Sequence, residues 1–388
     1  MKGHIRRRGR LSWAIVIDVG RDAGGKRRQR WHSAKGTKRD AERELSRLLH
    51  ELNTGGYVEP ARLTVSDYLT RWLADYAKTN VAPKTYERYA DIVAGHIRPA
   101  LGHYMLPKLQ PLHIQGFYSK ALAEGRRDGR KGGLSAQTVL HCHRVLHGAL
   151  KQALRWQLLS RNPADAVEPP RAQRKEMRAL DQDGMVKLLD AARGSRMYAP
   201  VFVALTTGLR RGELLGLHWK AIDLEKGSLS VCESLEETKA GLRLKQPKTG
   251  RSRRTVDLPS ILVEELRRHR VEQAKQRLAL GQLFQDQDLV FPENDGQPWS
   301  PDKFSGMFVS LARRAGLKGF RLHDLRHTHA TQLLKQGVHP KIVSERLGHA
   351  TVAITLDTYS HVLPGIQRQA VEALDVTLRG ALKTRGSA

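Results

Sequence analysis

The second half of the chain carries side chains that together could break and rejoin a phosphodiester bond. That reaction needs a nucleophile, cations that hold the non-bridging oxygens, and a proton donor for the leaving oxygen. Arginine suits the oxygens best, because its planar guanidinium can bind two of them at once. The candidate cations, proton carriers and nucleophile are, in chain order, Arg210, Lys248, His323, Arg326, His349 and Tyr359.

Each of these patterns is weak when it is taken alone. Glu213 is close enough in sequence to orient Arg210, but Arg-x-x-Glu on a helix is usually a surface ion pair. His323 and Arg326 lie three residues apart, hence on one face of a helix, where histidines are usually satisfied by neighbours or solvent. Tyr359 ends a short predicted helix, and a tyrosine in such a place is usually structural.

Lys248 and His349 are predicted in loops. Lys248 is expected at the tip of a hairpin formed by 242–246 and 251–258, where a flexible ammonium could reach into a cleft. The alternative is a basic hairpin that contacts a phosphate backbone without taking part in the chemistry. His349 follows a Leu-Gly pair at which a helix is expected to end.

The composition favours a partner with many negative charges. The 388 residues contain 67 Lys and Arg against 39 Asp and Glu, a formal net charge of +28 that is spread along the chain. Such a surface attracts polyanions and binds phosphates by releasing counterions, so nucleic acid is the leading candidate. A basic protein that binds ribosomal RNA, or nothing specific, is the alternative.

Cysteine usage and hydropathy bear on other classes of protein. Cys142 and Cys232 are far apart, which argues against a disulfide scaffold and against a cysteine-rich zinc site. The most apolar stretch, 199–205, is much shorter than the roughly 20 residues that span a bilayer. We therefore expect a cytoplasmic, nucleoid-associated protein without a metal, a cofactor or a membrane partner.

Breaks in the helical pattern divide the chain into parts. Residues 1–60 predict a small basic β-sheet plus a helix, and 64–162 predict an all-helical domain. Residues 163–178 combine prolines with basic residues, which is typical of an extended linker. Residues 179–388 predict a mostly helical domain with a small antiparallel sheet. The expected fold is multidomain and mainly α, with small antiparallel β-sheets.

Specific elements must position the candidate residues. The N-terminal strands are expected at 11–19 and 26–32, followed by a helix at 38–52. In the C-terminal part the helix periodicity and its caps place Arg210, His323, His349 and Tyr359 at or near helix ends, whereas Lys248 belongs to the predicted hairpin. The predicted helices there are 181–192, 198–207, 261–278, 301–315, 322–336, 340–347, 351–359 and a tail helix at 366–382, and a strand is predicted at 228–233.

The order and spacing of these motifs resemble one family closely, the tyrosine recombinases or phage-type integrases. The motif Thr-Gly-Leu-Arg-x-x-Glu-Leu occurs at 207–214, a lysine lies in Pro-Lys-Thr-Gly at 247–250, and His-x-x-Arg occurs at 323–326. Leu-Gly-His follows at 347–349, and the nucleophile of the family matches Tyr359. The resemblance implies a mixed α/β catalytic domain at 179–388, a helical core-binding domain of the SAM-like type at 64–162 and an arm-type DNA-binding domain at 1–60.

The resemblance also implies what the nucleophile and the arginines do. Tyr359 would attack a DNA phosphate and form a 3′-phosphotyrosyl bond, which leaves a free 5′-hydroxyl. Because this bond keeps the phosphoester energy, rejoining would need neither ATP nor a metal. Arg210 and Arg326 would hold the non-bridging oxygens, and Glu213 would support Arg210.

The remaining roles concern protons. The resemblance implies that Lys248 donates a proton to the 5′-oxygen and that His349 hydrogen-bonds the scissile phosphate. A tyrosine has an ordinary pKa near 10, so it needs a base or a strong cationic field at neutral pH. His323 is the candidate base.

Several alternatives remain open. His323 and His327 lie at i and i+4 as in a zinc hydrolase, although Asp324 replaces the expected glutamate. A catalytically silent DNA-binding relative and a type IB topoisomerase are further alternatives. Within the family, the extra N-terminal part favours the integrase of a prophage or integrative element over a Xer-like chromosome or plasmid resolvase.

The expected partners follow from the same resemblance. They are double-stranded DNA attachment sites, three further copies of the chain in a synaptic homotetramer, an excisionase and a host DNA-bending protein. The tail helix is expected to dock onto a neighbouring protomer, or else to fold back onto its own domain.

Overall fold

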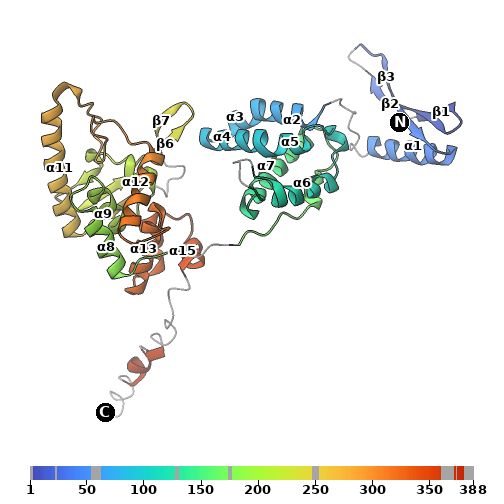
Figure 1. Cartoon of the computed structure of the whole chain (residues 1–388). Helices are drawn as coiled ribbons and strands as arrows, with labels where there is room; N and C mark the ends of the chain where they lie inside the picture. The colour runs from blue at the N-terminus through green and yellow to red at the C-terminus, as the bar shows by residue number, and fades with distance from the viewer. Residues whose placement is uncertain are drawn as a thin grey trace. The chain divides into compact units, whose positions relative to one another are not determined.

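The computed structural model describes residues 3–21, 24–53, 63–126, 131–173, 177–246, 253–359, 371–372 and 374–379. The chain forms two compact units, Met1–Arg174 and Lys175–Ala388 (Figure 1). Helices predominate in both units, and the three sheets that the described residues form are small and antiparallel. The expected fold class, mainly α with small antiparallel sheets, is confirmed. The division into three domains and a linker stays a prediction.

A three-stranded sheet opens the first unit. Its strand order is β1-β2-β3, and α1 packs against one face. The expected strands at 11–19 and 26–32 are confirmed, whereas β1 was not predicted, because its arginine-rich sequence lacks the alternation of apolar residues that indicates a strand. The elements are β1 (Gly3–Gly9), β2 (Ser12–Arg21), β3 (Arg27–Lys35) and α1 (Lys38–Asn53).

The helix α1 is positioned by its cap and its apolar stripe. The Thr37 backbone N–H donates to Asp40 Oδ2 at 2.8 Å, and the Asp40 N–H donates to Thr37 Oγ1 at 3.3 Å. Apolar residues at helical spacing then pack on Ile15 and Ile17, which are fully buried. Helix α1 therefore covers the face of the small sheet that carries Ile15 and Ile17. The opposite face, the open face, carries Trp31, which is 52% exposed, together with the buried Ala14 and Val16.

Helices form the rest of the first unit. Thr64 and Asp67 form a capping box at the start of α2, and α7 packs against several of the other helices. The Tyr68 hydroxyl crosses this core to donate to the Ala149 carbonyl at 2.5 Å. The elements are α2 (Val65–Trp72), η1 (Leu73–Ala77), α3 (Lys78–Asn80), α4 (Pro83–Ile92), η2 (Val93–Ile97), α5 (Arg98–Leu101), η3 (Leu106–Lys108), α6 (Pro111–Glu124), α7 (Ala136–Arg155) and η4 (Pro163–Ala166).

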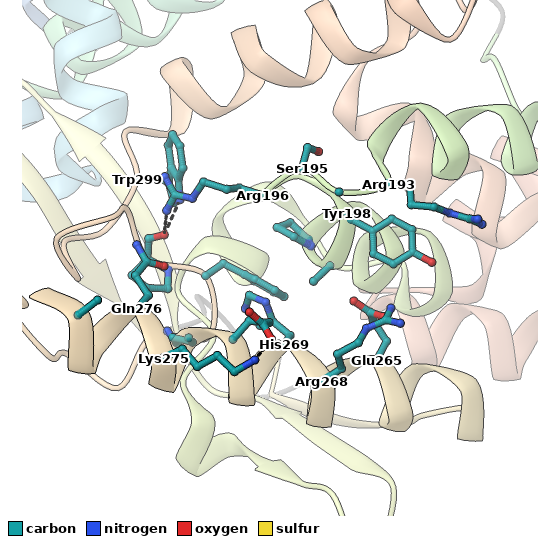
Figure 2. A pocket seen from close by; sticks show the side chains of 18 residues that line it. Arg193, Ser195, Arg196, Tyr198, Glu265, Arg268, His269, Lys275, Gln276 and Trp299 are labelled. Carbon is teal, nitrogen blue, oxygen red and sulfur yellow. Dashed lines mark hydrogen bonds and ion pairs between the residues drawn. The ribbon is translucent and has the colours of Figure 1, made fainter.

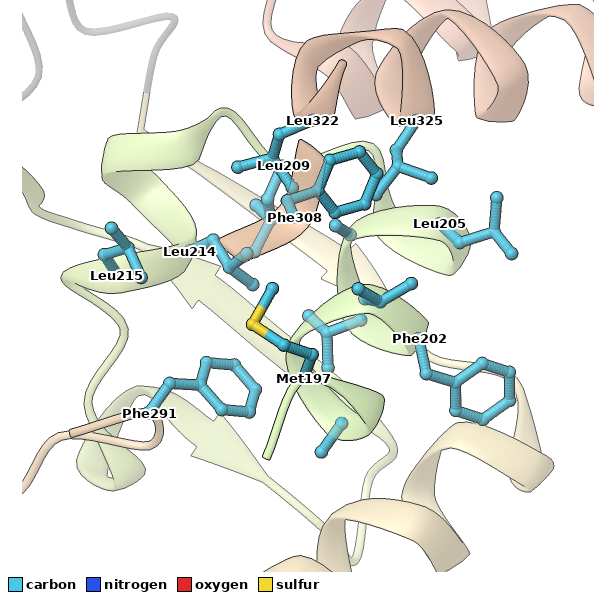
Figure 3. Close-up of a cluster of buried hydrophobic side chains, with 14 of the residues drawn as sticks. Met197, Phe202, Leu205, Leu209, Leu214, Leu215, Phe291, Phe308, Leu322 and Leu325 are labelled. Atoms are coloured by element: carbon cyan, nitrogen blue, oxygen red, sulfur yellow. The ribbon is translucent and has the colours of Figure 1, made fainter. Parts of the chain in front are cut away.

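The second unit is built around α9, a helix that is buried over most of its length (Figure 3). Helices α8, α11 and α13 pack against it. Phe202 and Leu205 of α9 lie in one core with Phe308 of α12 and Leu325 of α13. The elements are α8 (Gln182–Ala192), α9 (Tyr198–Thr207), α10 (Arg211–Leu215), η5 (Trp219–Ala221), β4 (Ile222–Asp223), β5 (Ser228–Val231), β6 (Ser234–Thr238), β7 (Gly241–Lys245), β8 (Arg254–Asp257), α11 (Ser260–Leu280), η7 (Gly281–Leu283), α12 (Pro301–Arg314), α13 (Leu322–Lys335), α14 (Pro340–Leu347) and α15 (Val352–Tyr359).

One strand pairing differs from the expectation. The segments 242–246 and 251–258 were predicted to pair with each other, but β7 pairs with β6, and β8 pairs with β5 in a separate sheet. A strand at 234–238 was not predicted, and it takes the place next to β7. The hairpin was therefore wrong, because local sequence does not decide which of several nearby strands becomes the partner.

Candidate active site

Arg210 lies at a sharp break between two helices. α9 ends at Gly208, whose φ of +68° is in the left-handed region, and Arg210 then caps α10. A Cβ at Gly208 would lie 2.6 Å from Leu347 Cδ2 and 2.8 Å from His329 Cδ2. Glycine is therefore required here for two reasons: it adopts the left-handed conformation, and it leaves room for α13 and α14 to pack close to the turn.

The Arg210 side chain is held by two neighbours and still faces solvent. Nη1 donates to Glu213 Oε1 at 2.8 Å, and Nη2 donates to the Gly348 carbonyl at 3.0 Å. The backbone N–H of Arg210 donates to Glu213 Oε2 at 2.9 Å, which fixes the start of α10. With 39% of its side chain exposed, Arg210 keeps donors available for a ligand.

Glu213 is shared with a second arginine. Arg254 of β8 donates from Nη2 to Glu213 Oε2 at 2.9 Å, and both side chains are buried. Arg254 Nε also donates to the Arg346 carbonyl at 2.7 Å. Burial by itself would raise the pKa of Glu213, but the hydrogen bond and charge of Arg254, with those of Arg210, lower it to about 2. The carboxylate therefore stays ionised and ties α10 to β8.

Arg326 is buried, and its side chain connects α13 to the ends of α9 and α14. Nη1 donates to the Gly208 carbonyl at 2.8 Å, and Nη2 donates to the Leu347 carbonyl at 2.7 Å. Burial, and then the nearby charge of Arg210, lowers the pKa of Arg326 to about 9, so it remains charged at neutral pH. The guanidinium groups of Arg210 and Arg326 thus converge at the break after α9.

Two histidines lie one helical turn apart on α13. The rings of His323 and His327 meet edge to face with 4.9 Å between their centroids. Burial and the charge of Arg326 lower the pKa of His323. Burial, with the neighbouring His323, lowers the pKa of His327 to about 4. Both imidazoles are therefore neutral at neutral pH.

His349 follows α14 at a left-handed turn. α14 ends at Gly348, whose φ is +66°. His349 Nδ1 lies 2.8 Å from the hydroxyl of Thr355, which is fully buried in α15. Burial and the charge of Arg326 lower the pKa of His349 to about 4. Thr355 therefore orients a neutral imidazole that faces the same arginine as His323.

Tyr359 closes the site from the end of α15. It is 2% exposed and packs in an apolar cluster that includes Leu334 and Leu347. Its hydroxyl lies 2.8 Å from His327 Nδ1. Burial raises the pKa of Tyr359 to about 12, and the charge of Arg326 acts in the opposite direction. The tyrosine is thus held near Arg326 by an imidazole that is not the predicted base.

The structure brings together most of the residues that the sequence singled out. Arg210, Arg326, His323, His349 and Tyr359 are linked to one another by direct contacts or by mutual electrostatic influence. Glu213 joins this group through Arg210. Lys248 lies outside the described residues, between β7 and β8.

Three supporting residues were not identified from the sequence. Arg254 lies in the predicted strand 251–258 and Thr355 in the predicted helix 351–359, but neither was given a role, and His327 was considered only as a zinc ligand. The spacing of His327 from His323 places it on the face that carries the site, which was the available signal. The structure adds that α15 packs against that face, so that His327 contacts Tyr359.

The described part of the chain contains neither a candidate metal site nor a candidate membrane span. Within it, no three His, Cys, Asp or Glu side chains gather in a way that could hold a metal ion. None of its helices is both long enough and apolar enough to cross a membrane.

A separate hollow of about 1130 Å³ lies between α9, α11 and the segment 291–299 (Figure 2). Arg196 lies over the Trp299 ring at 4.9 Å, and both side chains donate to the Pro292 carbonyl at 2.9 Å. His269 Nε2 donates to the Val290 carbonyl at 2.7 Å. This hollow shares none of its lining residues with the arginine, histidine and tyrosine cluster.

A cluster of two guanidinium groups, two imidazoles and a phenol is suited to a phosphodiester. The arginines can bind the non-bridging oxygens, the phenol can attack phosphorus, and the imidazoles can hold or move protons. Comparison with known proteins agrees with this chemistry. Residues 178–365 match the model of the phage integrase family, and 64–122 match the model of the phage integrase N-terminal SAM-like domain.

Full-length relatives and solved structures extend the match. A XerC-like tyrosine recombinase of Caldanaerobacter subterraneus is 29% identical over 95% of this chain and 96% of its own length. An integrase of Streptomyces ambofaciens is 29% identical over 96% of this chain and 95% of its own length. The fold is similar to that of the Tn1549 transposon integrase bound to transposon right-end DNA, with a TM-score of 0.68, 21% identity, and 81% of this chain and 100% of that chain covered. The chain therefore belongs to the phage integrase family and is a site-specific recombinase of the tyrosine type.

Proposed function

We propose that this protein is the integrase of a prophage or integrative element and that it cuts and rejoins attachment-site DNA through Tyr359. The observation that carries the proposal is the convergence of Arg210 and Arg326 on the neighbouring carbonyls of Gly348 and Leu347, with Arg326 near enough to the buried Tyr359 to act on its pKa. Both guanidinium groups are anchored to backbone carbonyls, so they are already in place when a phosphate arrives.

The arginine grip is supported by the contacts around it. Arg210 and Arg326 bind the non-bridging oxygens of the scissile phosphate, and Glu213 holds Arg210 in register while remaining ionised. His349, oriented by Thr355, donates a hydrogen bond to the phosphate. Tyr359 attacks phosphorus and forms a 3′-phosphotyrosyl link.

Lys248 provides the proton for the leaving 5′-oxygen in this proposal. Its support is the family motif and its position between β7 and β8, two strands that belong to different sheets. β8 also carries Arg254, which contacts Glu213.

The open face of the N-terminal sheet is proposed to bind arm-type DNA sites. Trp31 of β3 is 52% exposed there, and the guanidinium groups of Arg6 and Arg8 lie 5.6 Å and 5.9 Å from its ring. These arginines can contact phosphates and base edges, and the ring restricts their motion. The helical residues 64–162 would bind the core site, and 179–388 would perform catalysis.

The names of relatives favour mobile-element integration. The ICEBs1 integrase of Bacillus subtilis is 29% identical over 76% of this chain and 78% of its own length. The XerC-like relative supports the alternative, a Xer-like resolvase. A synaptic homotetramer, an excisionase and a host DNA-bending protein belong to the integrase proposal.

The central test uses a nicked suicide duplex that spans a junction between the element carrying the gene and its flanking DNA. Cleavage releases a short strand, so the covalent protein–DNA adduct accumulates. Wild-type protein is expected to form the adduct, and Tyr359→Phe is expected to form none. An adduct of unchanged yield with Tyr359→Phe would overturn the proposal.

Tyr118→Phe is the matched control. Tyr118 is also buried, and its hydroxyl lies 2.8 Å from a histidine nitrogen, that of His143. This variant should form the adduct at the wild-type rate. To separate integrase from resolvase, Trp31→Ala should lose binding to an arm-site duplex taken from the same element while it keeps binding to the core-site duplex. Unchanged binding of Trp31→Ala to the arm-site duplex would favour the resolvase.

A further inference from the structure

The hydroxyl of the proposed nucleophile has a partner that the family motif does not assign. His327 Nδ1 lies 2.8 Å from Tyr359 Oη, within the 2.6–3.2 Å reach that a general base requires. His323, the base that the resemblance implies, lies one turn earlier and contacts the edge of the His327 ring. The hydrogen bond that holds the phenol therefore runs to the second histidine.

We infer that His327 both positions Tyr359 and accepts its proton during DNA cleavage, an inference that rests on the proposed function. The geometry supports it from two sides. Tyr359 is 2% exposed, and a buried hydroxyl needs an acceptor for its proton. His327 lies on α13, which Arg326 anchors through hydrogen bonds to the Gly208 and Leu347 carbonyls, and its Nδ1 lies 2.8 Å from the hydroxyl.

The protonation state of His327 fits an acceptor. Its lowered pKa, caused first by burial and then by His323, keeps the imidazole neutral at neutral pH. A neutral imidazole with its proton on Nε2 has a free lone pair on Nδ1. The Tyr359 hydroxyl then donates to Nδ1, which is the arrangement that precedes proton transfer.

The step balances as follows. Tyr359 Oη forms a bond to phosphorus while its proton moves to His327 Nδ1. The bond from phosphorus to the 5′-oxygen breaks, its electron pair leaves with that oxygen, and the oxygen takes a proton from Lys248. Rejoining is the reverse, with the proton on His327 returning to Tyr359 Oη. Neither an oxidant nor a further reactant is needed.

DNA binding supplies the driving force for this transfer. Without DNA, the pKa of Tyr359 is raised to about 12 and that of His327 is lowered to about 4, so the proton stays on the phenol. A phosphate between the arginines offsets their positive charge and makes a protonated His327 easier to form. The charged and titratable groups that face His327 are Arg321, His323, Asp324 and Arg326 on α13, His349 after α14, and Tyr359 on α15.

The experiment compares His327→Asn with His323→Asn on the nicked suicide duplex. Asparagine can accept a hydrogen bond near the position of Nδ1 but cannot take a proton. His327→Asn is expected to slow adduct formation about 10²- to 10⁴-fold, as for loss of a general base. His327→Ala, which also removes the positioning bond, should be at least as slow. His327→Asn at the wild-type rate would overturn the inference.

A phenol with a lower pKa provides the specific readout. When a fluorinated tyrosine replaces Tyr359 alone, the need for a base decreases, so part of the lost rate should return in His327→Asn. The same replacement should not restore His323→Asn, whose role would be contact with the phosphate. Restoration in His323→Asn and not in His327→Asn would assign the base to His323 instead.

A measurement without DNA keeps the test independent of the substrate. In protein labelled with ¹⁵N-histidine, Tyr359→Phe should shift the His327 Nδ1 resonance, and Tyr118→Phe should shift that of His143. An unchanged His327 resonance would overturn the inference even if recombination were normal. If wild-type protein forms no adduct, the proposed function fails and the inference fails with it. An adduct in wild type and an equal rate in His327→Asn would remove the inference alone.

Discussion

Two tyrosine–histidine pairs, one in each compact unit, have nearly the same geometry. Tyr118 and Tyr359 are both buried, and each hydroxyl lies 2.8 Å from a histidine Nδ1, that of His143 and His327 respectively. Burial raises the pKa of both phenols. The charge of Arg326 acts against that rise at Tyr359, whereas at Tyr118 the neighbouring Cys142 adds to it. The hydrogen bond alone therefore does not distinguish a nucleophile from a structural tyrosine.

The surroundings of the second pair distinguish it. Arg326 lies beside His327 and is itself held by carbonyls at two breaks between helices. Arg210 and Arg254 share Glu213 next to it. In the first unit, Tyr118 packs in an apolar helical core instead. A tyrosine becomes a candidate nucleophile here because a preorganised group of cations lies beside it.

Removal of the carboxylate that organises these cations should have the largest effect on stability. Glu213→Ala removes the carboxylate that pairs with the buried Arg254, and breaking such a buried ion pair typically costs about 3–5 kcal/mol. Urea denaturation measures the free energy of unfolding. Glu265→Ala is the control, because that buried carboxylate pairs with Arg268, whose side chain is 67% exposed and can return to water. Equal losses would contradict the account of Glu213.

The same carboxylate predicts a dependence on pH. The pKa of Glu213 is about 2 in the folded chain against an ordinary 4.5, so the unfolded chain binds the extra proton between these values. Its contribution to stability is therefore complete above about pH 4.5 and is lost as the pH falls toward 2. Glu213→Gln should remove this part of the slope of unfolding free energy against pH.

Replacement of the buried arginine should have the next largest effect. Arg326→Lys keeps a positive charge but cannot donate to both the Gly208 and Leu347 carbonyls while it faces a phosphate. Adduct formation should fall about 10²- to 10³-fold, as when one donor to a developing charge is removed. Retained binding of the core duplex would show that the loss lies in catalysis. A wild-type rate would mean that the cations do not distinguish the two tyrosines.

A substitution at the turn before Arg210 should have a moderate effect. Gly208→Ala places an ordinary residue at a φ of +68°, which costs about 1–3 kcal/mol, and adds a close contact with Leu347 and His329. Gly337→Ala is the control, since its φ is +81° but a Cβ there meets nothing within 4 Å. Thermal unfolding should separate the two variants. An identical change would mean that the close packing at Gly208 contributes nothing.

Removal of either buried tyrosine hydroxyl should have the smallest effect on stability, and it compares the two tyrosine–histidine pairs most directly. Tyr118→Phe and Tyr359→Phe each remove one buried hydrogen bond, so each should cost about 0.5–1.5 kcal/mol of unfolding free energy. The two variants should therefore lose similar amounts of unfolding free energy, although only Tyr359→Phe abolishes the adduct. A much larger destabilisation in one variant would show that the two hydrogen bonds differ for reasons other than the cations.

Local patterns in the sequence determined much of this molecule. The helix ends around Arg210, Arg326 and His349 follow from glycine stops, caps and apolar spacing, which act over a few residues. The motif order also indicated the family and the candidate residues before any contact was known. These features were accessible because helices and their caps depend on residues that are near in sequence.

Tertiary structure decided the remaining features. β7 pairs with β6 and β8 with β5, although the sequence offered a simple hairpin. Glu213 serves Arg254 as well as Arg210, across 41 residues of chain. His323 and His327 share one face of α13, so helix spacing cannot say which of them meets Tyr359. The packing of α14 and α15 makes that choice, because contacts between distant segments depend on how whole helices fit together.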